Sequence, residues 1–391
     1  MVWAEKTRQT AVMRRIVTQK NEHLSTGILA AEDITAAFET GVIAADAPPI
    51  AGQIQPASLD LRLGTKAWRV QTSFLPGAYA TVADKLKSLA LHEIDLSEGA
   101  VLERGCVYVV ELQEKLALPE TLSAIANPKS STGRVDVFTR LITDGAIEFE
   151  SVTAGYHGPL YAEISPRTFS VLVRPGTRLS QLRLRRGAAI ISDEALATLQ
   201  QDRHLIRLAD EQKGQVNISH GVGLSVNFKP EDSSGLIGWR ARKHAGLIDM
   251  DKPASLPKTG FWERVTTDDL VAGGLVLNPD EFYILASREY VSVPPDLAAE
   301  MSAYDTRAGE FRAHYAGFFD PGFGIGAKGA EHTRAVLEVR SHDVPFLIEE
   351  DQIVCRLVYE HMATEPDWLY GADGSGSNYQ AQSLKLAKYF V

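Results

Sequence analysis

The sequence has 391 residues, of which 45% are hydrophobic and 23% charged, the composition of a globular protein with room for two domains. No run approaches the about 18 apolar residues of a membrane-spanning helix, so no membrane role is expected. The formal net charge of −10 disfavours non-specific binding to nucleic acid, so an anionic ligand would need a local basic cluster.

The first elements in chain order are a basic extension and a helix. Residues 1–25 carry several Lys and Arg side chains but lack the apolar core of a secretory signal, so the cytoplasm is the expected location. The segment that follows predicts a helix capped by Ser25 or Thr26 and ended by Gly41.

Most of the remaining sequence predicts short β-strands, because runs of four to seven β-branched and aromatic residues alternate with Gly and Pro turns. The runs are residues 59–64, 107–112, 160–164, 169–173, 178–184, 223–228, 282–286, 335–339 and 353–358. A second helix is expected at 192–202, before a polar linker at 209–215. Many short strands with few helices favour a mainly β fold built from compact barrel-like or jelly-roll-like modules.

The sequence contains an internal repeat with an offset of 175 residues. Residues 99–122 match 273–297, and Glu163 matches Glu338. We therefore divide the chain into a first repeat, residues 26–205, and a second repeat, residues 215–391. Cys106 and Cys355 each lie in an apolar strand-like run, so they are expected to be buried thiols, with no disulfide and no cysteine metal site.

A polar segment of the first repeat combines two cations, two hydroxyls and a glycine, in the order Lys129, Ser130, Ser131, Gly133 and Arg134. Hydroxyl and backbone donors with an arginine fork can hold phosphates. The alternative is a solvated turn between two strands.

Glu163 lies in a strand-like run whose alternate neighbours are apolar. A buried carboxylate has a raised pKa and can act as a general base near neutral pH. The alternative is a surface glutamate on a half-exposed strand, but the recurrence as Glu338 favours the functional interpretation.

Several segments together resemble the dCTP deaminase family, whose members have the trimeric dUTPase-like fold. The matching segments are residues 55–64, 118–134, 155–164, 173–184 and 370–382.

This resemblance implies hydrolytic deamination of dCTP to dUTP and ammonia. It implies that Glu163 is the general base and that Ser130 and Arg134 position the attacking water. The nucleotide would be bound by Lys129, Ser131, Thr132, Gly133, Tyr161, Ala162, Tyr370, Tyr379 and Gln382.

The resemblance also implies Mg²⁺ bound through the triphosphate and no catalytic metal. Zinc deaminases carry a His or Cys ligand near a Glu and a PCxxC pair, and this chain has no CxxC. Dependence on zinc is therefore not expected.

The second repeat departs from the pattern, since Asp305 and Gly309 stand where the first repeat has Ser130 and Arg134. An acidic side chain would repel a triphosphate, so catalysis is expected in the first repeat only. Conversely, the Asp-Pro-Gly turn of the family matches Asp320 in the second repeat, whereas the first repeat has Thr153.

The closing segment occurs once, at residues 370–382 of the second repeat, with Asn378 where a lysine is usual. It is expected to cover the site of the first repeat, so that deleting 370–391 would raise the KM. The alternative is a disordered polar terminus.

Two other functions stay open at this point. One is dUTP pyrophosphatase activity, alone or coupled to deamination, and the other is a catalytically silent dNTP-binding regulator. A homo-oligomer is expected, with a trimer favoured.

Overall fold

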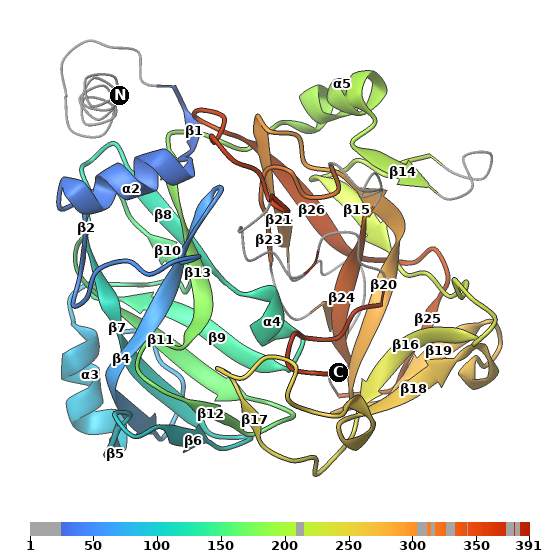
Figure 1. Cartoon of the computed structure of the whole chain (residues 1–391), viewed down its shortest axis with the longest axis horizontal. Helices are drawn as coiled ribbons and strands as arrows, with labels where there is room; N and C mark the ends of the chain where they lie inside the picture. The colour runs from blue at the N-terminus through green and yellow to red at the C-terminus, as the bar shows by residue number, and fades with distance from the viewer. Residues whose placement is uncertain are drawn as a thin grey trace.

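The computed structural model describes residues 25–208, 215–302, 311–313, 317–325, 333–341, 343–372, 379 and 384–391. The fold is mainly β, as predicted, and its two halves lie side by side (Figure 1). Its helices are α2 Ala31–Glu39, α3 Val82–Leu89, α4 Ser130–Gly133 and α5 Asp193–Arg203, with short 3₁₀ turns at Lys258–Gly260 and Thr267–Asp269. None of the described helices is long and apolar enough to cross a membrane.

The first half is built around a sheet of 11 strands with the central order β10-β8-β13-β4-β7-β11-β9. The strands of the first half are β1 Gly27–Ile28, β2 Ile43–Ala45, β3 Ile54–Gln55, β4 Ser58–Val70, β5 Ala90–Asp95, β6 Ala100–Leu102, β7 Val107–Ala117, β8 Ser123–Pro128, β9 Val137–Thr143, β10 Ser151–Val152, β11 His157–Pro166, β12 Val171–Val173 and β13 Arg178–Arg186. Of these, β6 and β12 lie outside the large sheet and form a separate sheet of three strands with β17 Ile248–Asp249. The backbone of Glu150 joins β8 to β9, because Ala126 N donates to its carbonyl at 2.8 Å and its own N–H donates to Leu141 O at 3.1 Å. The sheet therefore curls into a nearly closed barrel.

The second half contains a sheet of six strands, centred on β16-β20-β24, and a sheet of four strands, β15-β26-β21-β23. Its strands are β14 Ile206–Leu208, β15 Val222–Ser225, β16 Leu236–Ala241, β17 Ile248–Asp249, β18 Trp262–Thr266, β19 Gly274–Leu277, β20 Phe282–Val291, β21 Leu297–Ser302, β22 Phe311–Ala313, β23 Phe318–Phe319, β24 Thr333–Ser341, β25 Phe346–Glu349 and β26 Ile353–His361. All the runs predicted as strands overlap one of these elements.

Both cysteines are unpaired, and Cys355 is fully buried, as expected, whereas Cys106 is half-buried.

Two helix predictions can be compared with the structure. The first helix starts at Ala31 instead of after Ser25, because residues 27–28 pair with β13 as a strand and the hydroxyl of Ser25 donates to Ala363 O. Its end is as predicted, with Gly41 in the left-handed conformation. The expected helix at 192–202 is α5, capped by Ser192.

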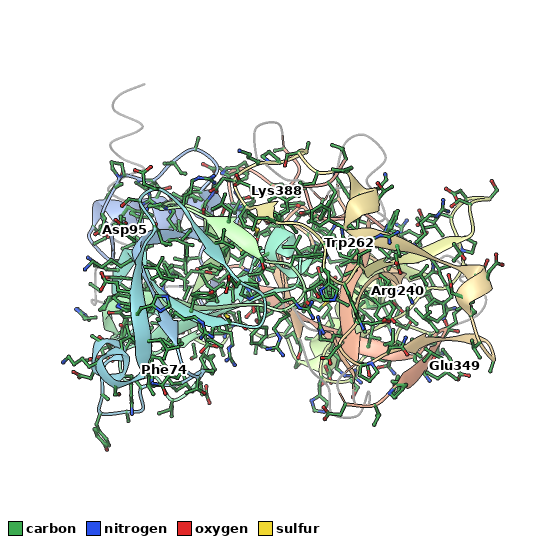
Figure 2. The ribbon with its side chains drawn as sticks, turned by 90° about the horizontal axis from the view of Figure 1, so that it is seen from below. Phe74, Asp95, Arg240, Trp262, Glu349 and Lys388 are labelled. Carbon is green, nitrogen blue, oxygen red and sulfur yellow. The ribbon has the colours of Figure 1, made fainter. Side chains whose placement is uncertain are left out.

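The two halves share their cores. The main cluster combines first-half side chains with Phe261, Trp262, Leu386 and Tyr389, so the end of the chain completes the core of the first half. Figure 2 shows Trp262 and Lys388 near the middle of the molecule, where the halves meet.

Side chains of α5 and β14 belong to the second core: Ile191, Leu196, Leu205 and Ile206 pack there. The predicted boundary after residue 205 therefore stays a proposal, and this packing favours an earlier one.

Candidate active site

The polar segment of the first repeat forms the short helix α4, which leaves β8 after Pro128. Lys129 is the N-cap in extended conformation and Arg134 is the C-cap. Ser131, Thr132 and Gly133 are buried, whereas Ser130 is half-buried. Figure 1 shows α4 at the junction between the two halves.

A cavity of about 430 Å³ lies at this junction and is lined by both repeats. The first repeat contributes Lys129, Ser130, Ser131, Arg134 and Arg178, and the second contributes Asp320, Val336, Glu338, Tyr370, Tyr379 and Lys388. The site is therefore composite, with the α4 segment from one repeat facing β24 of the other.

Glu338 is the carboxylate that lies nearest to Arg134 in this cavity. Its side chain is 4% exposed, and burial raises its pKa to about 7, although the positive charge of Arg134 opposes that rise. Arg134 Nε lies 3.8 Å from Glu338 Oε1, which is too long for a hydrogen bond. That Nε is buried and has no hydrogen-bond partner among the residues that the structure describes.

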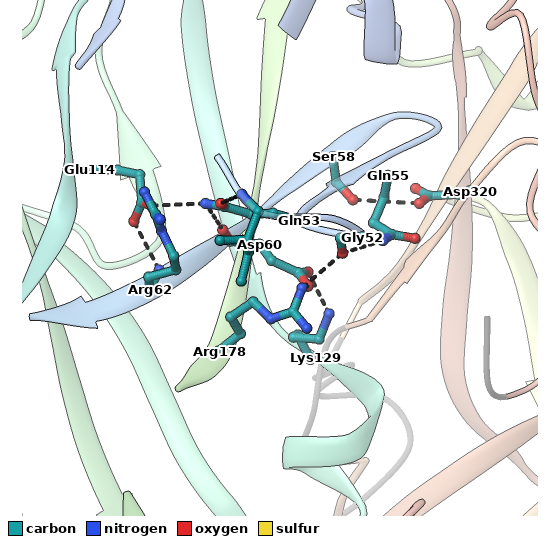
Figure 3. A network of polar contacts seen from close by, with 11 residues as sticks. Gly52, Gln53, Gln55, Ser58, Asp60, Arg62, Glu114, Lys129, Arg178 and Asp320 are labelled. Atoms are coloured by element: carbon teal, nitrogen blue, oxygen red, sulfur yellow. Dashed lines mark hydrogen bonds and ion pairs between the residues drawn. The ribbon is translucent and has the colours of Figure 1, made fainter. Parts of the chain in front are cut away.

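A cationic cluster forms another part of the cavity wall (Figure 3). Asp60 is buried and accepts a short hydrogen bond from Lys129 Nζ, and Arg178 Nη1 lies 3.2 Å from its other oxygen. Lys388 joins them from the end of the chain, and burial together with the charges of Lys129 and Arg178 lowers its pKa. In this part of the wall the three cations face two carboxylates, Asp60 and Asp251, so the local charge is positive and favours an anionic ligand.

Asp320 is held in the wall of the cavity by the first repeat. Arg183 of β13 is fully buried and lies 2.8 Å from Asp320 Oδ1, and it also donates to Phe319 O at 3.0 Å. The hydroxyl of Ser58 contacts the other oxygen of Asp320 at 3.4 Å (Figure 3). This buried pair fixes the turn of the second repeat against the first.

The closing segment contributes two tyrosines to the cavity. The ring of Tyr379 lies over the guanidinium of Arg134, with 3.9 Å from Cζ to the ring centroid. Tyr370 packs against Phe323 and donates its backbone N–H to Pro321 O at 2.8 Å. Arg134 Nη1 also donates to the carbonyl of Lys385 at 2.7 Å, so the segment contacts the arginine from two directions.

Family models match nearly the whole chain. The model described as the 2'-deoxycytidine 5'-triphosphate deaminase N-terminal domain matches residues 25–188, and the C-terminal domain model matches residues 192–390. The chain belongs to the dCTP deaminase family. This confirms the resemblance seen in the sequence, together with the dUTPase-like fold that it implied.

Individual members of the dCTP deaminase family are also similar. The chain is 32% identical over 161 residues to a dCTP deaminase of Haloarcula marismortui, covering 40% of this chain and 78% of the relative. It is 30% identical over 139 residues to a dUMP-forming dCTP deaminase of Methanothermobacter thermautotrophicus, covering 35% and 64%. The crystal structure of 2'-deoxycytidine 5'-triphosphate deaminase from Agrobacterium tumefaciens is 53% identical with a TM-score of 0.81, covering 86% of this chain and 99% of that one.

The structure does not bring Glu163 to Ser130 and Arg134, contrary to the interpretation from the sequence. Glu163 is 2% exposed and pairs with Arg140 of the adjacent strand, 2.5 Å from Nη2. Arg140 in turn donates to Ser73 and lies over the ring of Phe149. The carboxylate of Glu163 is thus bound by an arginine of its own repeat through one oxygen, and the residue that lines the cavity is its counterpart, Glu338.

Tyr161 and Ala162 are likewise outside the cavity. Tyr161 packs against Val82 and Leu86 of α3, and Ala162 belongs to the main core. The helix α3, which the sequence analysis did not predict, therefore shares a buried cluster with Tyr161 of β11.

The other predicted residues divide into three groups. Lys129, Ser130, Ser131, Arg134, Tyr370 and Tyr379 line the cavity, and Thr132 and Gly133 are buried in α4 behind them. Gln382, Asp305 and Gly309 lie outside the described residues. The lining residues that were not predicted as ligands include Glu338, Arg178, Asp320 and Lys388. The signal for Glu338 and Asp320 was present, since the second repeat alone combines a matching glutamate with the Asp-Pro-Gly turn.

Proposed function

We propose that the protein deaminates dCTP to dUTP and ammonia in one site shared by its two repeats, with Glu338 as the general base. The single observation that carries this assignment is the pair formed by Glu338 and Arg134 in the cavity. Glu338 has a pKa of about 7, which suits a base near neutral pH, and Arg134 Nε is a buried donor without an acceptor. The family membership supports the substrate and the reaction.

The attacking water would lie beside Glu338 Oε1, close to the guanidinium of Arg134, whose Nε is 3.8 Å from that oxygen. Glu338 would take a proton from this water as the water oxygen bonds to C4 of the cytosine, and would pass the proton to N3. The proton of the new hydroxyl would then move through Glu338 to the amine, which leaves as ammonia while C4=O forms. Arg134 and Ser130 would orient the water and stabilise the charge that develops.

The cationic cluster would hold the triphosphate. Lys129, Arg178 and Lys388 supply the charge, and Ser131 and the turn of Thr132 and Gly133 supply hydroxyl and backbone donors. Tyr379 would cover the nucleotide while it stacks on Arg134, and Tyr370 would line the same wall. In this arrangement Tyr370 and Tyr379 of the closing segment would cover a site made by both repeats.

Mg²⁺ is proposed to enter with the triphosphate. Within the described residues, no group of three or more His, Cys, Asp and Glu is arranged to hold a metal ion. Mg²⁺ is often bound through substrate phosphates and one or two carboxylates, and Asp60 and Asp251 line the cavity. Bound there, Mg²⁺ would neutralise phosphate charge. Its proposed ligands are different residues from Glu338, Arg134 and Ser130, which are assigned to water activation.

Product analysis tests this function. Incubation with dCTP and Mg²⁺ should release ammonia and dUTP. Glu338→Gln should abolish turnover because it removes the base, whereas Glu163→Gln should retain most of it and serves as the control. If Glu163→Gln abolishes turnover and Glu338→Gln does not, the general base is Glu163 of the first repeat.

A dUMP-forming activity is the second candidate. Asp320 supports it, since this residue shares the cavity with the α4 segment and removes the objection raised by Thr153. However, Asp320 is already paired with Arg183, which favours a binding role over water activation. Release of dUMP and pyrophosphate together with ammonia would support the bifunctional enzyme. If the protein releases none of these products, a nucleotide-binding regulator is the function that remains.

A further inference from the structure

Glu338 and Arg134 come from different repeats, so contacts across the junction must set their separation. Glu338 and Arg340 are alternate residues of β24 and therefore lie on the same face of the strand. Arg134 and Asp136 are likewise two residues apart, just after α4. A second ion pair, Arg340 with Asp136, therefore runs beside the contact of Glu338 with Arg134.

The two contacts differ in strength. Arg340 Nη2 makes a short hydrogen bond to Asp136 Oδ2 and donates to Thr168 Oγ1 at 2.8 Å, and Thr168 donates to the same carboxylate oxygen. Arg340 is 6% exposed and Asp136 is fully buried. Charge-assisted hydrogen bonds in a buried site fix the geometry of the groups that they join. Arg134 and Glu338 are 3.8 Å apart and make no such hydrogen bond through these atoms.

The backbone around Asp136 is also anchored. Asp136 has a left-handed φ of 56°, its N–H donates to Gly133 O at 2.8 Å, and its carbonyl accepts from Arg167 N at 2.9 Å. The carboxylate is therefore attached to the end of α4 through a fixed turn. A contact that holds Asp136 in place therefore also holds the segment that carries Arg134.

We propose that Arg340 and Asp136 form a positioning pair that fixes Glu338 relative to Arg134 across the two repeats. This role rests on the proposed function of the cavity. If the strand moved closer, Glu338 would form a direct ion pair with Arg134 and the space for water would be lost. The pair is specific to this junction, since the repeat positions equivalent to Arg340 and Asp136 are Ser165 and Phe311.

The test compares substitutions of two buried arginines on β24. Arg340→Gln should lower kcat for dCTP by roughly 10–100-fold with little change in KM, because a small displacement misaligns the base while the cationic cluster stays intact. Arg340→Lys should recover part of the kcat, since it keeps one charged donor. The matched control is Arg334→Gln, which removes hydrogen bonds to Ser287 O and Glu231 within the second repeat and should lower Tm without lowering kcat.

Kinetics are measured well below the Tm of each variant and normalised to folded protein. A wild-type kcat in Arg340→Gln, or a raised KM with unchanged kcat, would overturn the positioning role. If Arg340→Gln does not fold, Asp136→Asn replaces it, because Asn tolerates the left-handed conformation but loses the charge, and here too an unchanged kcat would overturn the role. A wild-type protein that releases no ammonia from dCTP would instead refute the proposed function, and this role with it.

Discussion

Two glutamates at equivalent repeat positions have opposite environments. Glu163 is neutralised by Arg140 at hydrogen-bond distance, whereas Glu338 faces Arg134 across a gap and has a pKa near 7. Burial alone does not make a base, since both side chains are buried. What distinguishes them is whether the nearest cation satisfies the carboxylate directly or leaves room for water.

The pH dependence of catalysis should follow from a single residue. Glu338 must be ionised to accept a proton, and burial raises its pKa to about 7, so kcat/KM should fall as the pH drops below about 7 and level off above it. The measurement is ammonia release from dCTP at constant ionic strength between pH 5 and pH 9, roughly two units either side of that pKa. Glu163→Gln should give the same profile as the wild type, and a profile that is flat through pH 7 would contradict the assignment of Glu338.

The sequence predicted the α4 segment and both tyrosines of the closing segment, because each carries its chemistry within a few neighbouring residues. It combined that segment with Glu163, whereas the cavity that the segment lines contains Glu338. Aligning the repeats assumes that each copy builds its own site, yet the fold places α4 of one repeat opposite β24 of the other. Arg183 illustrates the same limit, since its buried contact with Asp320 spans 137 positions along the chain. Tertiary placement of this kind leaves no local signal.

At the scale of elements, the end of the chain is a structural segment as well as a cover for the site. Leu386, Ala387 and Tyr389 are buried in the main core, and the carbonyl of Tyr389 accepts from Leu256 N at 3.0 Å. Deleting residues 370–391 would therefore remove core packing, so loss of stability is expected in addition to the rise in KM.

Tyr389→Ala should lower the free energy of unfolding by about 3–5 kcal/mol, because it removes a fully buried aromatic ring and leaves a cavity. Chemical denaturation of the full chain measures this loss. Tyr79→Ala, at a fully exposed tyrosine, is the control and should change stability little. Equal stability of the two variants would show that the final segment does not support the core.

At the scale of the whole molecule, each chain holds the parts of one candidate site, divided between its repeats. A homo-oligomer stays a prediction, but the described residues bring Glu338 and Arg134, the proposed catalytic pair, to one cavity without a second chain.

Mixing inactive chains tests this arrangement. Co-expression of Arg134→Gln chains with Glu338→Gln chains should yield no dCTP deaminase activity, because every chain lacks one member of its own pair. Wild-type chains mixed with either variant should show activity in proportion to the wild-type fraction. Activity recovered from the two inactive chains together would place the site between chains.

The aromatic contacts at the junction also affect how the protein is made. Phe169 of the first repeat packs against Trp262, with ring centroids 5.6 Å apart, and Trp262 packs against Phe390 at 5.8 Å. During synthesis the first repeat therefore lacks part of its aromatic core until Phe390 has been made. A chain truncated before Phe390 would leave Trp262 without this ring contact, and a chain truncated before Trp262 would also leave Phe169 without the ring of Trp262.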